Sequence, residues 1–237
     1  MNFDEFKSNF VEFVWQYKTK LNEEQLKKFY NYMNLLNEWN KKINLTAIIE
    51  PKDVIEKHFV DSLTAMDFIN DKSKIIDIGT GAGFPGIPLK IANNTLEITL
   101  LDSLQKRVNF LNVVINDLNL SDIYAVHSRA EDFISNNRES FDIAISRAVA
   151  NISTLSEYLL PYVKVGGTAI FMKGPNIKEE LENGKKAIKL LGGKVEEVNN
   201  FTLGKNNERN IIIVRKISNT PTKFPRKAGK PAKNPIK

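Results

Sequence analysis

The chain contains no cysteine and only two histidines, His58 and His127, among its 237 residues. A protein without cysteine can form no disulfide bond, no thiolate metal site and no cysteine nucleophile. Two imidazoles also supply a histidine-based metal centre poorly, because protein metal sites draw many of their ligands from histidine and cysteine. We therefore expect no metal, and no enzyme that works through a bond between cysteine and substrate.

Long apolar segments are also missing from the chain. No apolar run approaches the roughly 18 residues of a membrane span, and the N-terminus does not have the character of a signal peptide. A composition of 42% hydrophobic and 26% charged residues is ordinary for a soluble globular protein. We expect a cytoplasmic protein that has a sizeable core and does not bind membranes.

Acidic residues are absent from Arg215 to the C-terminus, where eight basic residues occur. The rest of the chain has 26 basic residues (34 less 8) and 28 acidic ones, a net charge of −2, against +6 for the whole. Such local basicity predicts an arm that meets a polyanion, with a solubilising, disordered end as the alternative. Prolines at 221, 225, 231 and 235 predict that the tail, residues 218–237, has no regular structure.

Residues 1–70 have the pattern of helices that form a cap on the next domain. Asn22 is typical of a helix start, residues 39–46 form a polar break, and Pro51 begins another helix. Aromatic residues recur at helical spacing, which usually marks core positions. They are Phe3, Phe6, Phe10, Phe13, Tyr17, Phe29, Tyr30 and Trp39.

From Lys74 the pattern changes to alternating strands and helices. The predicted strands are 74–79, 97–102, 122–127, 141–146, 166–172, 194–200 and 209–215. The predicted helices are 86–93, 104–118, 130–136, 152–163 and 177–191. Residues 71–217 are therefore expected to form a mostly parallel, doubly wound α/β domain. The short connection 201–208 predicts a final hairpin, with an antiparallel last strand.

A glycine-rich turn, residues 79–86, follows the first predicted strand and opens a helix. Gly81–Gly86 satisfies the G-x-G-x-x-G fingerprint of dinucleotide-binding folds. The register of Asp77, Gly79, Gly81 and Gly83 instead resembles motif I of the Rossmann-like methyltransferases that use S-adenosylmethionine. The acid before the loop and the terminal hairpin favour S-adenosylmethionine, with Gly79 and Gly81 in contact with it. A turn without a ligand is the plain alternative.

Three further strand ends supply candidate residues, because ligands of α/β sheets bind outside the carboxyl ends of the strands. Asp102 can accept hydrogen bonds from the ribose hydroxyls, or it can cap the following helix. Ala130 and Glu131 can read the adenine edge, although a helix N-cap by Ser128 explains the segment equally well. Arg147 is costly to bury alone, so it is expected to meet a carboxylate, a phosphate or a base, with a purely structural salt bridge as the alternative.

The end of the fourth predicted strand also bears on the methyl acceptor. Enzymes that methylate exocyclic amino groups typically have an Asn/Asp/Ser-Pro-Pro-aromatic motif there, whereas residues 146–149 read Ser-Arg-Ala-Val. Enzymes that methylate pyrimidine C5 generally use a cysteine, which this chain lacks. Guanine N7 needs neither device, because it has a free lone pair and loses no proton. The sequence therefore fits an N7 acceptor without requiring one.

With these motifs, the chain resembles the bacterial 16S ribosomal RNA guanine-N7 methyltransferases, also called the glucose-inhibited division protein B family. The matching stretches are 39–46, 58–63, 77–89, 102–103, 106–107, 110–111, 129–131, 146–150, 173–174 and 224–231. The resemblance implies a Rossmann-like fold, S-adenosylmethionine as cofactor, and one guanine in the decoding region of small-subunit RNA as acceptor. It implies cofactor contacts at Gly79, Phe84, Ala130, Glu131 and Arg147.

We expect in-line attack of guanine N7 on the sulfonium methyl group without a general base, with Arg147 orienting the cofactor or the guanine. The expected phosphate contacts are Lys106, Arg107, Lys173, Arg226 and Lys227. His58 is either an RNA contact or a structural histidine. The protein is expected to act as a monomer on 16S RNA or on the small subunit.

Three other functions stay open at this point. They are a methyltransferase of the same fold for another RNA, a nicotinamide-dependent oxidoreductase, and a non-catalytic RNA-binding protein.

Overall fold

A computed structural model describes residues 1–14, 20–147, 150–205 and 207–237. Its sheet has seven strands in the order β3-β2-β1-β4-β5-β7-β6. They are β1 (Lys74–Ile78), β2 (Glu97–Asp102), β3 (Ile123–His127), β4 (Phe141–Arg147), β5 (Val163–Lys173), β6 (Gly193–Leu203) and β7 (Asn207–Lys216). Strands β1 to β5 pair in parallel, and β7 is antiparallel to β5 and β6. The predicted α/β fold is confirmed, including its terminal hairpin.

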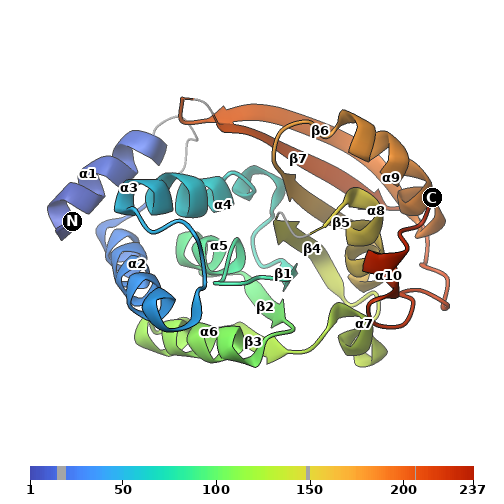
Figure 1. Ribbon diagram of the computed structural model, residues 1–237, viewed down its shortest axis with the longest axis horizontal. Coiled ribbons are helices and arrows are strands. Elements are labelled where there is room, and N and C mark those ends of the chain that lie inside the picture. The colour runs from blue at the N-terminus through green and yellow to red at the C-terminus, as the bar shows by residue number, and fades with distance from the viewer. Residues whose placement is uncertain (15–19, 148–149, 206) are drawn as a thin grey trace.

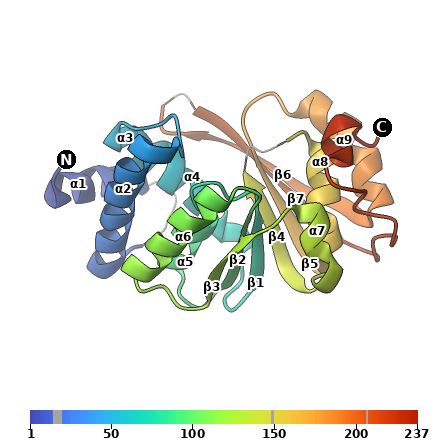
Figure 2. The ribbon, with the colours of Figure 1, turned by 60° about the horizontal axis from the view of Figure 1, so that its bottom comes forward.

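Helices cover both faces of this sheet (Figure 1, Figure 2). The N-terminal segment holds α1 (Phe3–Val14), α2 (Glu23–Ile43), α3 (Pro51–Val54), the π-helix η2 (Ile55–Val60), α4 (Asp61–Leu63) and the 3₁₀ turn η3 (Met66–Phe68). The later helices are α5 (Gly86–Ala92), α6 (Gln105–Asp117), α7 (Ala130–Phe133), η4 (Ile134–Asn136), α8 (Ile152–Leu159), η5 (Leu160–Tyr162), α9 (Lys178–Leu190) and α10 (Lys230–Lys233). No helix in the described ranges has the length and apolar character to cross a membrane.

The sheet separates two hydrophobic cores, because successive side chains of a strand point to opposite faces. Ile75 belongs to the core beneath α1, α2, α5 and α6, whereas Ile76 belongs to the core beneath α8 and α9. The predicted aromatic stripe supplies the first core, in which Phe6, Phe10 and Phe29 are at most 1% exposed. Tyr17, predicted to belong to it, lies outside the described residues. The N-terminal helices therefore share their core with the sheet.

Helix α2 begins as predicted but ends later than predicted. Asn22 and Gln25 form a reciprocal capping box, with hydrogen bonds of 2.8 and 2.9 Å. The expected polar break at residues 39–46 was wrong over its first half, because α2 continues to Ile43 and ends at Asn44 in the left-handed conformation. Trp39 and Ile43 pack against the first core, so the polar residues between them form only the solvent face of a continuing helix.

The C-terminal tail also differs from the prediction. Residues 218–237 contain a helical turn, α10, with Pro231 in its first turn. The missing N–H of proline is harmless there, because the first N–H groups of a helix have no intrahelical partner. Phe224 is 6% exposed and belongs to the second core together with side chains of α8. The tail is therefore packed on the α8 side of the domain (Figure 1).

Candidate functional site

The glycine-rich loop between β1 and α5 turns through three left-handed residues. The φ angles of Gly79, Gly81 and Gly83 are 71°, 63° and 100°, a region that L-residues rarely enter. A Cβ on Gly83 would lie 2.6 Å from the Tyr32 hydroxyl, which donates a hydrogen bond to the carbonyl of Ala82. A Cβ on Gly81 would meet nothing within 4 Å. The loop is thus held from below by α2, and Gly81 borders open space.

Asp77, at the end of β1, organises this loop from inside the protein. Its fully buried carboxylate accepts hydrogen bonds from Thr80 Oγ1 at 2.7 Å and from the Gly86 amide at 2.9 Å. Its other oxygen, Oδ1, has no partner among the described groups. Burial raises the pKa of Asp77 to about 6, against the opposing effect of these two hydrogen bonds.

Asp102 joins the end of β2 to the same loop. Its Oδ2 accepts from the Gly81 amide at 2.9 Å and from Arg107 at 3.3 Å, and its Oδ1 accepts from the Leu104 amide at 2.9 Å. Asp102 does not cap the following helix, the alternative considered for it, because the N-cap of α6 is Leu104 and Asp102 binds the amide of that N-cap residue rather than an amide of the first helical turn. Arg107, expected at a phosphate, forms an ion pair with Asp102.

A cavity of about 490 Å³ opens above the loop at the carboxyl ends of β1, β4 and β5. Six of the predicted site residues line it: Gly79, Gly81, Phe84, Arg107, Arg147 and Lys173. Six others do not: Asp102, Ala130, Glu131, Lys106, Arg226 and Lys227. Residues 148 and 149 of the predicted acceptor segment lie outside the described residues. Half of the predicted site residues therefore line one cavity.

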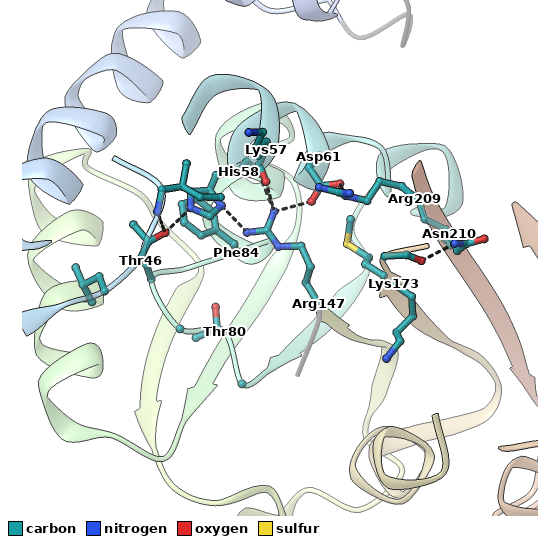
Figure 3. A pocket seen from close by; sticks show the side chains of 18 of the residues that line it. Thr46, Lys57, His58, Asp61, Thr80, Phe84, Arg147, Lys173, Arg209 and Asn210 are labelled. Atoms are coloured by element: carbon teal, nitrogen blue, oxygen red, sulfur yellow. Dashed lines mark hydrogen bonds and ion pairs between the residues drawn. The ribbon is translucent and has the colours of Figure 1, made fainter. Parts of the chain in front are cut away.

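Arg147, at the end of β4, is held by the segment that runs through η2 and α4 (Figure 3). Its Nη1 donates to Asp61 Oδ2 and to the carbonyl of His58, both at 3.1 Å. Further contacts of Nη1 at 3.3 Å are the carbonyl of Lys57 and the hydroxyl of Ser62. Asp61 is therefore the carboxylate that a buried arginine was expected to need.

The ring of Phe84 adds a contact on the face of the guanidinium, 4.9 Å from its carbon. This arrangement combines a cation–π contact with the hydrogen bonds to the π-helix. Burial lowers the pKa of Arg147 and the neighbouring Asp61 opposes that shift. We conclude that Arg147 is a fixed cation in the cavity wall.

His58 is a structural neighbour of Arg147 and also lines the cavity. Its Nδ1 lies 3.2 Å from Arg147 Nη2, and its Nε2 lies 2.8 Å from Thr46 Oγ1. Because a guanidinium can only donate, Nδ1 is the acceptor and the proton of the neutral ring lies on Nε2. Burial, with the Arg147 charge as a smaller cause, lowers the pKa of His58 to about 3. His58 is therefore neutral near pH 7 and uses both ring nitrogens.

Two residues that sequence reasoning did not assign complete this network. Asp61 Oδ1 accepts from Arg209 Nε of β7 at 3.1 Å, so one carboxylate joins two arginines (Figure 3). Asp61 lies in a stretch that carried the family resemblance, but its role needs the contact with β4. Tyr32 was a third omission, and the aromatic stripe of α2 gave no signal of its contact with Ala82.

The remaining predicted residues have protein partners elsewhere. Lys173 Nζ donates to the carbonyl of Ala150 at 2.7 Å and pairs with Glu180 at 2.8 Å. Glu131 Oε1 accepts from the Gly229 amide of the tail at 2.8 Å, and the Ala130 carbonyl accepts from Tyr162 at 2.6 Å.

Arg226 and Lys227 are neighbours in the tail, but one is bound to a carboxylate and the other is exposed. Arg226 forms an ion pair with the buried Glu157 of α8 at 2.6 Å. Lys106 and Lys227 are exposed. In the described ranges, no group of three His, Cys, Asp or Glu side chains is placed to hold a metal ion.

Comparison with solved structures shows the fold. A TYW2 structure from P. horikoshii in complex with MeSAdo superposes with a TM-score of 0.55 at 16% identity, covering 66% of this chain and 61% of that one. A SAM-dependent methyltransferase from Aquifex aeolicus has a TM-score of 0.53 at 20% identity, covering 75% of this chain and 97% of that one. Both likenesses confirm the predicted Rossmann-like methyltransferase architecture.

Comparison of sequences identifies the family. The family model described as rRNA small subunit methyltransferase G matches residues 25–212. Proteins named ribosomal RNA small subunit methyltransferase G include one from Acetivibrio thermocellus, 51% identical over 95% of each chain. Another, from Clostridium botulinum strain Alaska E43, is 52% identical over 92% of this chain and 93% of its own. The chain belongs to the rRNA small subunit methyltransferase G family.

Proposed function

We propose that this protein transfers the methyl group of S-adenosylmethionine to N7 of a guanine in 16S ribosomal RNA. The family supports the methyltransferase class and the small-subunit RNA substrate. The observation that carries the proposal is the cavity in which the left-handed glycine loop meets the fixed cation Arg147. The enzyme acts in the cytoplasm as a monomer.

The loop and its neighbours fit this cofactor. Gly81 borders open space where a side chain would project, and the cavity volume lies within the usual range for small-molecule sites. Gly79, Gly81 and Phe84 would hold the methionine side in the cavity, and Asp102, Ala130 and Glu131, which lie outside the cavity lining, would hold the adenosine side. Asp102 accepts three hydrogen bonds, which leaves one of about four acceptor positions for a ribose hydroxyl. The bound cofactor supplies an electrophilic methyl group.

The arrangement at His58 suits an acceptor that needs no general base. Both ring nitrogens of His58 are used, and its lowered pKa keeps the ring neutral without making it a free acceptor. Guanine N7 loses no proton when it is methylated, so positioning is the main task of the site. Arg147 orients the reacting groups, because its own position is fixed by Asp61 and Phe84.

The cations around the cavity suit an RNA backbone. Lys57 and Arg209 line the cavity in addition to the predicted Arg107 and Lys173. Exposed Lys106 lies next to Arg107 on α6 and is free to reach a phosphate. We retain Lys106, Arg107, Lys173 and Lys227 as proposed phosphate contacts. Arg107 and Lys173 would exchange their ion pairs with Asp102 and Glu180 for a phosphate, and Arg226 is considered separately below.

Methyl transfer tests the proposal directly. The protein is incubated with S-adenosylmethionine labelled in its methyl group and with small-subunit RNA, free or in assembled subunits, from cells without this activity. We expect label in small-subunit RNA, none in large-subunit RNA, and a loss of at least a hundredfold in rate with Arg147→Ala.

Binding measurements made beside this assay separate two alternatives. Binding of NAD in preference to S-adenosylmethionine would support the oxidoreductase. Binding of RNA by a wild-type protein that transfers no label would support a non-catalytic RNA-binding protein.

A further inference from the structure

The C-terminal tail has a contact whose strength does not fit a loose basic arm. The side chain of Glu157 on α8 is 0% exposed, and Arg226 is 19% exposed. Arg226 donates to Glu157 through its backbone amide at 2.7 Å, through Nε at 2.9 and 3.0 Å, and through Nη2 at 2.6 Å. A buried carboxylate needs such compensation, so the folded domain requires the tail in this place.

Three more contacts hold the tail on either side of this ion pair. Phe224 is buried in the second core, and its carbonyl accepts a hydrogen bond from Arg138. Thr154 Oγ1 of α8 donates to the carbonyl of Pro231 at 3.1 Å. The chain from Phe224 to Pro231 is therefore fixed at both ends and at Arg226 between them.

Between these anchors, the tail reaches the proposed adenosine side of the cofactor site. Gly229 has a φ of 79°, and its amide donates to Glu131 Oε1 at 2.8 Å. Within the described part of the chain, this amide is the hydrogen-bond donor to Glu131, so Oε2 is left for a ligand.

We propose that the segment 224–231 is a strap that positions Glu131 for the cofactor, and that Arg226 and Glu157 lock the strap. Arg226 is then a positioning residue for the cofactor rather than a phosphate contact. The inference rests on the proposed function, because it takes Glu131 as a cofactor contact. By linkage, a cofactor that prefers the ordered Glu131 also stabilises the docked strap.

Cofactor affinity tests the strap without any turnover. Titration calorimetry with S-adenosylmethionine is carried out on the full chain and on Arg226→Lys, which keeps the charge but loses the fork that matches a carboxylate. We expect the dissociation constant to rise about tenfold, a usual size for coupling between two sites. Lys230→Ala is the matched control, because it removes an exposed cation of the same segment and should leave the affinity unchanged.

A double-mutant cycle separates positioning from general stability. If the strap acts through Glu131, Arg226→Lys should weaken cofactor binding when Glu131 is present. In a protein that already carries Glu131→Ala, adding Arg226→Lys should change the affinity little. Equal effects in both backgrounds would overturn the proposal. A wild-type protein that binds no S-adenosylmethionine would instead contradict the proposed function itself.

Proteolysis gives a second readout, which needs no variant at Arg226. Trypsin can cut after Lys227 only when the segment undocks, since cleavage requires an open chain, whereas the bond after Lys230 precedes Pro231 and resists trypsin. Saturating S-adenosylmethionine should slow cleavage after Lys227 in the wild-type protein several-fold and should lose that effect in Glu131→Ala. Cleavage that is equally fast with and without the cofactor would show that the strap and the cofactor are not coupled.

Discussion

Asp61 Oδ2 lies 3.1 Å from Arg147 Nη1, although the two residues are 86 positions apart in the chain. The contact joins the N-terminal helical segment to the end of β4 and fixes the cation of the cavity. Both side chains are nearly buried, 6% exposed for Asp61 and 13% for Arg147. Removing one member of a buried pair is strongly destabilising, because the other charge is left uncompensated.

Asp61→Asn should therefore lower the free energy of unfolding by about 3 kcal/mol or more. Asp53→Asn is the matched control, because Asp53 pairs with Lys57 at 2.9 Å but is 43% exposed. Exposed pairs contribute roughly 0 to 1 kcal/mol, so this variant should be almost as stable as the wild type. Urea unfolding followed by circular dichroism measures both. Equal losses in the two variants would show that Asp61 does not compensate a buried charge.

Gly81→Ala should weaken S-adenosylmethionine binding by at least tenfold. Gly81 and Gly166 both have a positive φ, 63° and 87°, and a Cβ at either would meet nothing within 4 Å. Alanine therefore introduces a similar backbone strain of about 1 kcal/mol at both positions. Only Gly81 borders the cavity above the loop. Calorimetric titration of both variants should show unchanged affinity for Gly166→Ala, and the same loss in both would mean that the loop does not hold the cofactor.

His58 should make the protein less stable as the pH falls. Its pKa is lowered from 6.5 to about 3, so between these values the unfolded chain takes up a proton that the folded protein does not. The contribution of His58 is present above pH 6.5 and is lost as the pH falls through that window. The advantage of wild type over His58→Gln in unfolding free energy should shrink by about 2 kcal/mol from pH 7 to pH 5.

Asp77 has the opposite effect on the pH dependence of stability, over part of the pH range in which His58 acts. Its pKa is raised from 3.8 to about 6, so its folded form keeps a proton that the unfolded chain releases as the pH rises through that range. Asp77 therefore destabilises the protein as pH rises, and the pH comparison must be made between wild type and His58→Gln rather than within one curve. If the difference in unfolding free energy between wild type and His58→Gln stays constant from pH 7 to pH 5, His58 is not buried in its neutral form.

Lys106→Ala and Lys227→Ala should each weaken RNA binding and reduce the slope of log Kd against log salt by about 1. Both lysines are exposed, so a phosphate can replace water around them. Arg226→Ala should leave the slope unchanged, because its guanidinium is bound to Glu157. Filter binding across a salt series measures all three, and a reduced slope for Arg226→Ala would return that residue to the phosphate contacts.

The strands and helices of the sheet could be predicted because their signals are local. Hydrophobic runs, the glycine loop and the capping box at Asn22 each lie within a few residues of what they specify. The tail could not be predicted in this way. Its prolines and lysines are typical of a free arm, whereas its position depends on Glu157, a buried carboxylate that precedes Arg226 by 69 residues.

The candidate site could also be predicted only where its signals are local in the sequence. The glycine loop and the end of β4 gave Gly79, Gly81 and Arg147, which line one cavity, because a parallel sheet brings such positions to one edge. The partner of Arg147 was expected to be a carboxylate, a phosphate or a base, and its identity as Asp61 needs the packing of the N-terminal helices on the sheet. Arg209 was missed for the same reason, since its contact with Asp61 spans 148 residues.

The position of the transferred methyl group tests the central claim most directly. Small-subunit RNA methylated by the protein is reduced with borohydride and treated with aniline, which cleaves the chain at N7-methylguanine, and nuclease fragments are analysed by mass spectrometry. We predict cleavage at a single guanine of the small-subunit RNA that depends on S-adenosylmethionine and is lost with Arg147→Ala. A methyl group found on another atom, or on several scattered guanines, would contradict the account.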